Sequence, residues 1–80
     1  MIKTLPTLGQ RLRTARKQKF PNDDLSGFAL RIGVSRATLQ KMEKGDLSVT
    51  IGKYYRASEV LGLEASFNTL LEVKGSLFDD

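Results

Sequence analysis

The side chains of this sequence that could do chemistry are almost all cationic. The 80 residues include 13 Lys and Arg, 9 Asp and Glu, and no His or Cys. Without His and Cys, the usual zinc sites and the commonest general base are missing. We therefore expect no metal, no cofactor and no enzymatic activity, and binding of an anionic partner is the chemistry that remains.

The charge is divided unevenly along the chain. Residues 1–45 hold ten basic and three acidic residues, a net charge of +7, whereas residues 46–80 hold three basic and six acidic residues, a net charge of −3. A polyanion would be attracted to the first half, and the second half is free to contact something else. On charge alone, a solvated basic surface with no partner is an equally simple interpretation.

Residues 25–45 have the spacing of two short helices joined by a tight turn. Ala29 leaves room for a second helix to cross closely, and Gly33 stands where the turn needs a positive φ, which only glycine adopts cheaply. Ser35 would cap the second helix, with Val34 between the two. Two helices that cross steeply through a short glycine turn form the unit that places its second helix in a DNA major groove. The apolar positions of the pair are Phe28, Ala29, Ile32, Leu39 and Met42.

Apolar periodicity and capping residues predict five helices in one domain. The expected ranges are residues 8–19, 25–32, 36–44, 51–61 and 63–73, with a core at about 8–72 and tails at 1–7 and 74–80. In the last helix, Phe67, Leu70 and Leu71 are expected to face inward; a short strand at residues 71–73 is the alternative for its end. The expected N-caps are Thr7, Asp23 or Asp24, Ser35 and Thr50.

Several motifs of this chain occur together in one known family. They are Phe28-Ala29, Gly-Val-Ser at 33–35, Thr38-Leu39, Met42-Glu43-x-Gly45, Thr50-Ile51, Tyr54, Leu61-Gly62, and Leu12, Arg13 and Arg16 in the first helix. In this combination the chain resembles the Cro and lambda-repressor type helix-turn-helix domain, the XRE family. The resemblance implies an all-α, five-helix lambda-repressor-like fold, a helix-turn-helix formed by the second and third helices, and sequence-specific DNA binding in the cytoplasm, at the nucleoid.

The start of the second helix departs from the family pattern. Leu25, Ser26 and Gly27 occupy the turn where the family often has a Gln that contacts DNA. Asp23 and Asp24 stand where the helix would approach a phosphate; they suit the helix dipole but repel the anion. The DNA contact that the family's Gln makes is therefore not carried over to this chain.

The resemblance implies that the exposed residues of the third helix contact DNA bases. Arg36 can bind guanine through O6 and N7, and Gln40 can bind adenine. A short helix with an ordinary solvated face is the alternative. The candidates for base contact are Arg36, Ala37, Thr38, Gln40 and Lys41, and those for phosphate contact are Ser35, Lys44, Arg11, Thr50 and Lys53. The resemblance also implies a structural ion pair between Arg16 and Glu43.

The expected function is that of a dimeric repressor on a palindromic operator, because one small domain reads too few base pairs for selectivity. The apolar residues left over after the four-helix core is filled are Phe67, Leu70, Leu71, Val73, Leu77 and Phe78. Of these, Phe67, Leu71, Val73 and Phe78 are expected at a homodimer interface, unless the fifth helix uses them to close the core. Residues 45–71 resemble HipB-like antitoxins, which repress their own operon and hold a HipA-like kinase toxin. A phage Cro-like repressor and a protein-interaction module with this fold are the alternatives.

Overall fold

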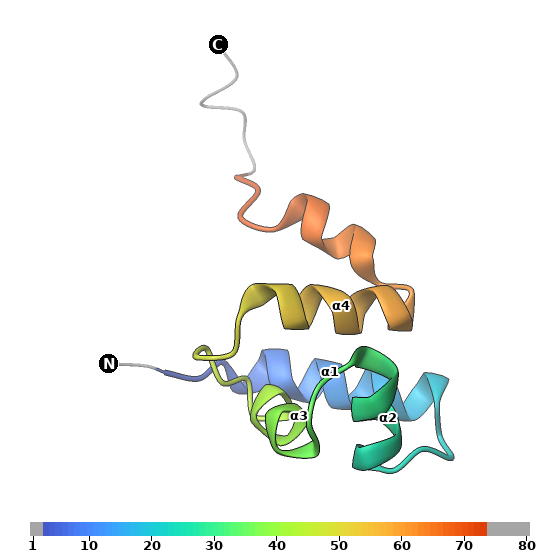
Figure 1. Cartoon of the computed structure of the whole chain (residues 1–80). Coiled ribbons are helices and arrows are strands. Elements are labelled where there is room, and N and C mark those ends of the chain that lie inside the picture. The colour runs from blue at the N-terminus through green and yellow to red at the C-terminus, as the bar shows by residue number, and fades with distance from the viewer. Residues whose placement is uncertain (1–2, 74–80) are drawn as a thin grey trace.

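The computed structural model describes residues 3–73, which fold into four α-helices followed by one 3₁₀-helix (Figure 1). The helices are α1 (Pro6–Lys19), α2 (Leu25–Ile32), α3 (Arg36–Glu43), α4 (Ile51–Leu61) and η1 (Glu64–Thr69). Within these residues, no helix is long and apolar enough to cross a membrane. The predicted all-helical fold is confirmed.

The core lies where α1, α2, α3 and α4 meet. Phe28, Leu39 and Met42 are its largest fully buried side chains, and all three belong to the predicted helix-turn-helix. Val34, in the turn, packs against the same core. The other buried apolar residues are Leu12, Ala29, Ile32, Tyr54, Ala57 and Leu61. Burial of these side chains therefore holds α2 and α3 against the other two helices.

Local turn chemistry sets the start of α2 and of α3. The Asp24 carboxylate accepts a hydrogen bond from the Gly27 N–H at 2.7 Å, and the Ser35 hydroxyl accepts one from the Thr38 N–H at 3.0 Å. Between them, Gly33 ends α2 with φ of 73°. The capping roles predicted for Asp24 and Ser35, and the positive φ predicted for the turn, are confirmed.

The backbone of α1 approaches the end of α3 very closely. A Cβ atom added to Gly9 would lie less than 3.0 Å from the carbonyl oxygen of Glu43, and one added to Gly45 would lie less than 3.0 Å from that of Leu5. The Leu5 N–H donates a hydrogen bond to the Gly45 carbonyl oxygen at 2.8 Å, just before α1 begins. These contacts leave no room for a side chain at either glycine.

Among the first four helices, two boundaries and two N-caps differ from the prediction. α1 begins at Pro6 instead of residue 8, with Leu5 and not Thr7 at the N-cap, because a proline at the first helical position loses no hydrogen bond and has a helical φ. α3 ends at Glu43, one residue early. Thr50 stands at the N-cap of α4, but its side chain makes no capping hydrogen bond.

A fifth helix is present as predicted, but it is not an α-helix and does not extend over residues 63–73. η1 is a 3₁₀-helix of six residues, in which the hydroxyls of Ser66 and Thr69 donate to carbonyl oxygens three residues earlier. Such local hydrogen bonds compete with α-helical ones. Phe67 packs against the core, but Leu70 and Leu71 are 54% and 90% exposed and do not face inward. Residues 71–73 form no strand either.

The loop between α1 and α2 is closed by an arginine. Arg31 forms an ion pair with Asp23, and its guanidinium carbon lies 4.1 Å from the centre of the Phe20 ring. The Phe20 ring in turn lies 5.8 Å from that of the buried Phe28. The hydrogen bond from Arg31 lowers the pKa of Asp23 below its ordinary value of 3.8. Ionised Asp23 therefore favours the folded state.

The close contact at Gly9 predicts that a single methyl group there destabilises the fold. We expect Gly9→Ala to reduce the free energy of unfolding by about 1–3 kcal/mol, the usual cost of overpacking. Gly52→Ala is the matched control, because a Cβ at Gly52 meets nothing within 4 Å and Ala has the higher helix propensity. Urea denaturation measures both variants, and equal stability of the two would contradict the contact.

The lowered pKa of Asp23 predicts a pH-dependent effect of Asp23→Asn. A carboxylate with a depressed pKa stabilises the folded state above its ordinary pKa, and this contribution is lost as the pH falls through the depressed value. The variant should thus melt at a lower temperature than the wild type near neutral pH and at the same temperature in strong acid. Asp24→Asn is the control, because Asn caps a helix as well as Asp. A difference that persists in strong acid would contradict this assignment.

Candidate nucleic-acid interface

α3 presents one face to the core and the other to solvent. Leu39 and Met42 are fully buried, whereas Arg36, Gln40 and Lys41 are exposed. Ala37 is exposed as well, and positions 36, 37, 40 and 41 share one face of a helix. Four of the five residues expected to contact bases are therefore side by side on the outer surface of α3.

Thr38 is the exception in this set. Its side chain is half-buried, and its hydroxyl oxygen accepts a hydrogen bond from the Ser35 hydroxyl at 3.0 Å. Ser35 itself is exposed and accepts from the Thr38 N–H. These two hydrogen bonds link the side chains of Ser35 and Thr38 to the first turn of α3.

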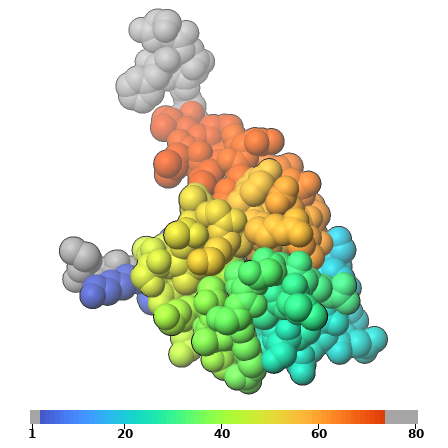
Figure 2. Space-filling view, viewed as in Figure 1, coloured from blue at the N-terminus to red at the C-terminus, as the bar shows by residue number. Residues whose placement is uncertain are grey.

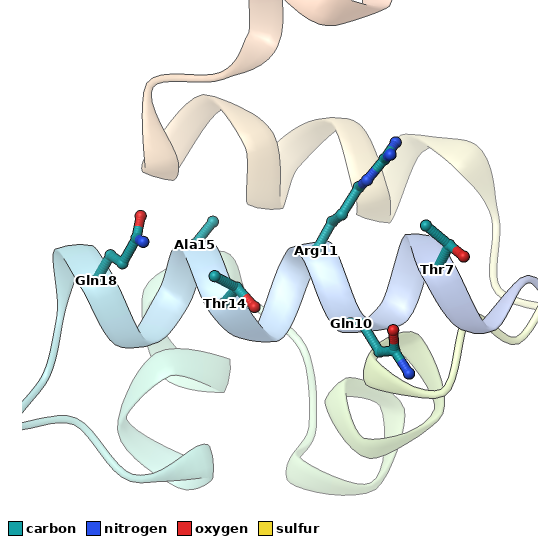
Figure 3. A pocket seen from close by; sticks show the side chains of 6 residues that line it. All are labelled: Thr7, Gln10, Arg11, Thr14, Ala15 and Gln18. Carbon is teal, nitrogen blue, oxygen red and sulfur yellow. The ribbon is translucent and has the colours of Figure 1, made fainter.

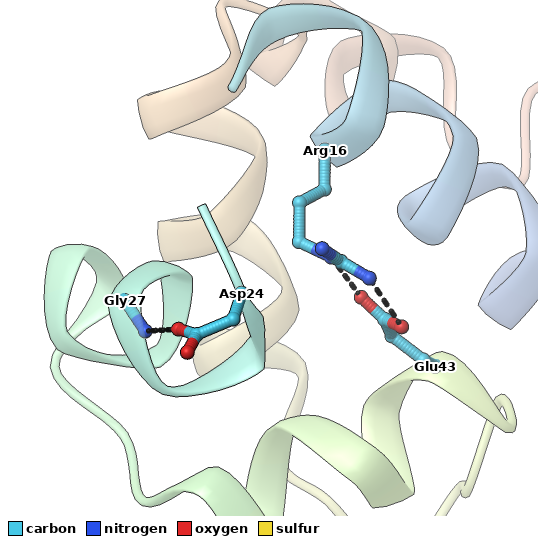
Figure 4. A network of polar contacts seen from close by, with 4 residues as sticks. All are labelled: Arg16, Asp24, Gly27 and Glu43. Carbon is cyan, nitrogen blue, oxygen red and sulfur yellow. Dashed lines mark hydrogen bonds and ion pairs between the residues drawn. The ribbon is translucent and has the colours of Figure 1, made fainter. Parts of the chain in front are cut away.

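Arg16 and Glu43 form the expected ion pair between α1 and α3 (Figure 4). Nε and Nη2 of Arg16 donate to the two carboxylate oxygens of Glu43 at 2.6 and 3.2 Å. The two side chains are only 6% and 10% exposed. A two-point ion pair buried to this extent has a fixed geometry, so it aligns the end of α3 with α1.

A polar hollow of about 300 Å³ lies beside this ion pair. Lys44 and Gln40 line it, together with Arg13 on α1, and within residues 3–73 neither Lys44 nor Arg13 has an ionic partner. Arg13 was not among the residues expected from the sequence to contact DNA. Its position three residues before Arg16, on the same helix face, is the signal that could have placed it here.

The first turn of α4 follows α3 after a short loop. No side chain caps this turn. The Lys53 N–H donates to the Thr50 carbonyl oxygen at 3.1 Å, and within residues 3–73 the N–H groups of Ile51 and Gly52 have no partner. Lys53 and Thr50 are exposed there, and the space around Gly52 is open. Such a turn, with a lysine next to it, suits an oxygen anion.

Arg11 lies on the side of α1 that faces α4. It extends from α1 toward α4 (Figure 3), whereas Gly9 and Arg16 contact α3 from the other side of the helix. A hollow along the surface of α1 is lined by Thr7, Gln10, Arg11, Thr14, Ala15 and Gln18 (Figure 3). The structure therefore places Arg11 on a different side of α1 from the junction with α3.

A family model for helix-turn-helix domains matches residues 22–68, which is more than half of the chain. The chain belongs to the Cro/C1-type helix-turn-helix family, the XRE family. Comparison with curated proteins and with solved structures gives no match. The family assignment makes the protein a DNA-binding transcription regulator. The matched region contains α2, α3 and α4 of the regulator, but not α1.

The residues expected at a dimer interface of the regulator differ from one another in how exposed they are. Phe67 is half-buried, and its ring meets that of Tyr55 edge-on at 5.2 Å. Leu71 and Val73 are 90% and 63% exposed. Phe78 lies outside the described residues. Phe67 thus serves the fold, while Leu71 and Val73 present apolar surface to solvent.

The buried ion pair predicts a strongly non-additive response to substitution. Arg16→Met leaves the Glu43 carboxylate buried without a partner and should cost about 3–5 kcal/mol of unfolding free energy. The double variant Arg16→Met/Glu43→Leu should be more stable than Arg16→Met alone, because no charge remains buried. Urea denaturation of the three proteins measures this.

The exposed ion pair of Arg56 with Glu59 provides the control. Arg56→Met removes an arginine from a pair that solvent screens, so it should change stability little. If Arg16→Met lowered the unfolding free energy no more than Arg56→Met does, the ion pair between α1 and α3 would not be a buried structural pair.

Proposed function

We propose that the regulator is a repressor that reads a specific DNA sequence with α3 in the major groove. The observation that carries this is the exposed face of α3, which holds Arg36, Gln40 and Lys41 opposite the buried Leu39 and Met42. Arg36 would bind guanine and Gln40 adenine, each through two hydrogen bonds. The methyl groups of Ala37 and Thr38 would meet thymine methyls.

The phosphate contacts in this proposal come from both ends of α3. Ser35 lies at its start and Lys44 at its end, and the hollow beside Lys44 adds Arg13. The uncapped first turn of α4, with Thr50 and Lys53, supplies a further contact. Phosphate contacts fix the orientation of a protein on DNA, and base contacts then select the sequence.

We further propose that the repressor acts as a homodimer on an inverted repeat. One domain of this size reads few base pairs, and a two-fold dimer doubles the recognised sequence. The proposed interface is in the C-terminal part, with Leu71, Val73, Phe67 and Phe78. The exposure of Leu71 and Val73 supports it, since apolar surface of this kind marks contact sites.

A role as the autoregulating antitoxin of a toxin-antitoxin operon is our proposal for its biological setting. It rests on the resemblance of residues 45–71 to HipB-like antitoxins. A gene for a HipA-like kinase next to the gene of this regulator, and co-purification of the two products, would test it. A phage setting would favour a Cro-like repressor instead.

The DNA-binding proposal predicts different effects for a substitution on the exposed face of α3 and for one at the end of α3. Arg36→Ala should relax selectivity at one base position in each half-site, by about 1–3 kcal/mol. Lys44→Ala should weaken binding to all sequences alike. It should also reduce the slope of log affinity against log salt concentration by about one unit. Selection from random duplexes followed by salt titration measures both effects.

Arg56→Ala is the matched control, because it removes the same charge from an exposed residue of α4 whose carboxylate partner is Glu59. It should leave the selected motif unchanged. An unchanged motif with Arg36→Ala would refute the proposed reading face. Recovery of no motif by the wild type would refute the repressor and favour a protein-interaction module.

A further inference from the structure

An apolar groove of about 400 Å³ lies between α1, α4 and η1. Its volume is in the range of sites that bury small apolar groups. Leu63 and Leu70, at η1, also line it and are 50% and 54% exposed. The remaining apolar lining comes from Leu8, Leu12, Ala15, Tyr54, Leu61 and Phe67. The groove therefore leaves apolar surface in water, which is the signature of a binding site.

The polar groups of the groove define what else its occupant must carry. The hydroxyls of Ser58 and Ser66 donate to backbone carbonyl oxygens and are not free to bind a ligand. Arg11 is the one charged residue of the lining, and within residues 3–73 it has no ionic partner. The matching occupant is a short segment with apolar side chains and a carboxylate next to them.

The chain itself contains such a segment in Leu77, Phe78, Asp79 and Asp80. These residues lie outside the described part of the structure, so they enter by their sequence alone. We propose that the groove binds this segment from a second copy of the chain, with Leu77 and Phe78 in the groove and the aspartates at Arg11. The inference rests on the proposed homodimer and names its contact.

The direction in which the chain leaves η1 favours binding of this segment to the groove of a second copy over binding to the groove of its own copy. η1 and the residues after it project from the body formed by the four α-helices, and up to residue 73 the chain runs away from α4 (Figures 1 and 2). Leu71, with φ of 64°, and Val73 are exposed along this path. To enter the groove of its own copy, the chain would have to reverse this direction within residues 74–76, whereas a second copy can be reached in the direction that the chain already takes.

A reciprocal exchange gives a closed two-fold dimer, because each copy supplies one segment and one groove. It also leaves α3 accessible. The groove contacts α1 through Leu8, Arg11 and Ala15, whereas α3 lies against Gly9 and Arg16. The two surfaces are on different sides of α1.

Charge reversal in the full-length chain tests the proposal. We expect Arg11→Glu, and separately Asp79→Lys/Asp80→Lys, to weaken dimerisation about tenfold, because each turns the attraction into repulsion. An equal mixture of the two variants should regain dimers, since every groove then meets a segment of opposite charge. Sedimentation equilibrium measures the dissociation constants. Lys17→Glu is the matched control on α1 and should have no such effect, because Lys17 is exposed and does not line the groove.

The possible outcomes separate this inference from the homodimer itself. Wild-type protein that stays monomeric would refute the homodimer and the exchange together. Variants that each dimerise as the wild type does would refute the groove contact and leave the homodimer standing. If both variants are weakened but the mixture regains nothing, the segment does not bind across copies, and the exchange is refuted.

Discussion

The position of α3 depends on one side of α1. The α1 backbone at Gly9 meets Glu43, the last residue of α3, so closely that Gly9 has no room for a Cβ, and Leu5, just before α1, leaves none at Gly45. The buried ion pair of Arg16 with Glu43 lies at the same junction. α3 has only eight residues, far too few for an isolated helix to be stable in water. Its existence as a helix and its direction therefore follow from this packing, and the reading face depends on both.

The junction also explains why an ion pair is present in such a small core. Burying two charges costs desolvation free energy, so the pair is a weak source of stability compared with apolar residues of the same size. Its value is geometric, because a guanidinium and a carboxylate that share two hydrogen bonds accept only one relative orientation. A helix that must present Arg36 and Gln40 to fixed positions on DNA gains more from a defined orientation than from extra stability.

Local signals in the sequence predicted the helix-turn-helix well. Gly33, Ser35 and Asp24 act through their own backbone or the next turn, so their roles can be derived without tertiary structure. The apolar periodicity of α2 and α3 identified Phe28, Leu39 and Met42 as core residues because a helix face is a local pattern. The partnership of Arg16 with Glu43 came from family resemblance, since nothing local joins residues 27 positions apart.

The predictions that failed needed information about packing. Apolar periodicity over residues 63–73 suggested an α-helix, but α1 to α4 already fill the core, and only Phe67 finds a place against it. The set of DNA-binding residues predicted from the sequence was incomplete for the same reason. Arg11 and Arg13 are both exposed arginines on α1, and only the directions of α3 and α4 decide that Arg13 joins the hollow beside Lys44 and Arg11 the apolar groove.

α1 therefore connects the two surfaces on which the proposed function depends. One side of the helix fixes α3 through Gly9 and Arg16, and another side lines the groove with Leu8, Arg11 and Ala15. A dimer that reads an inverted repeat must hold its two reading helices at the spacing of the half-sites. In the copy that supplies the groove, this contact and the reading helix would be connected through α1, a helix of 14 residues. Contacts on the groove side would then constrain DNA selectivity from a surface other than the proposed reading face.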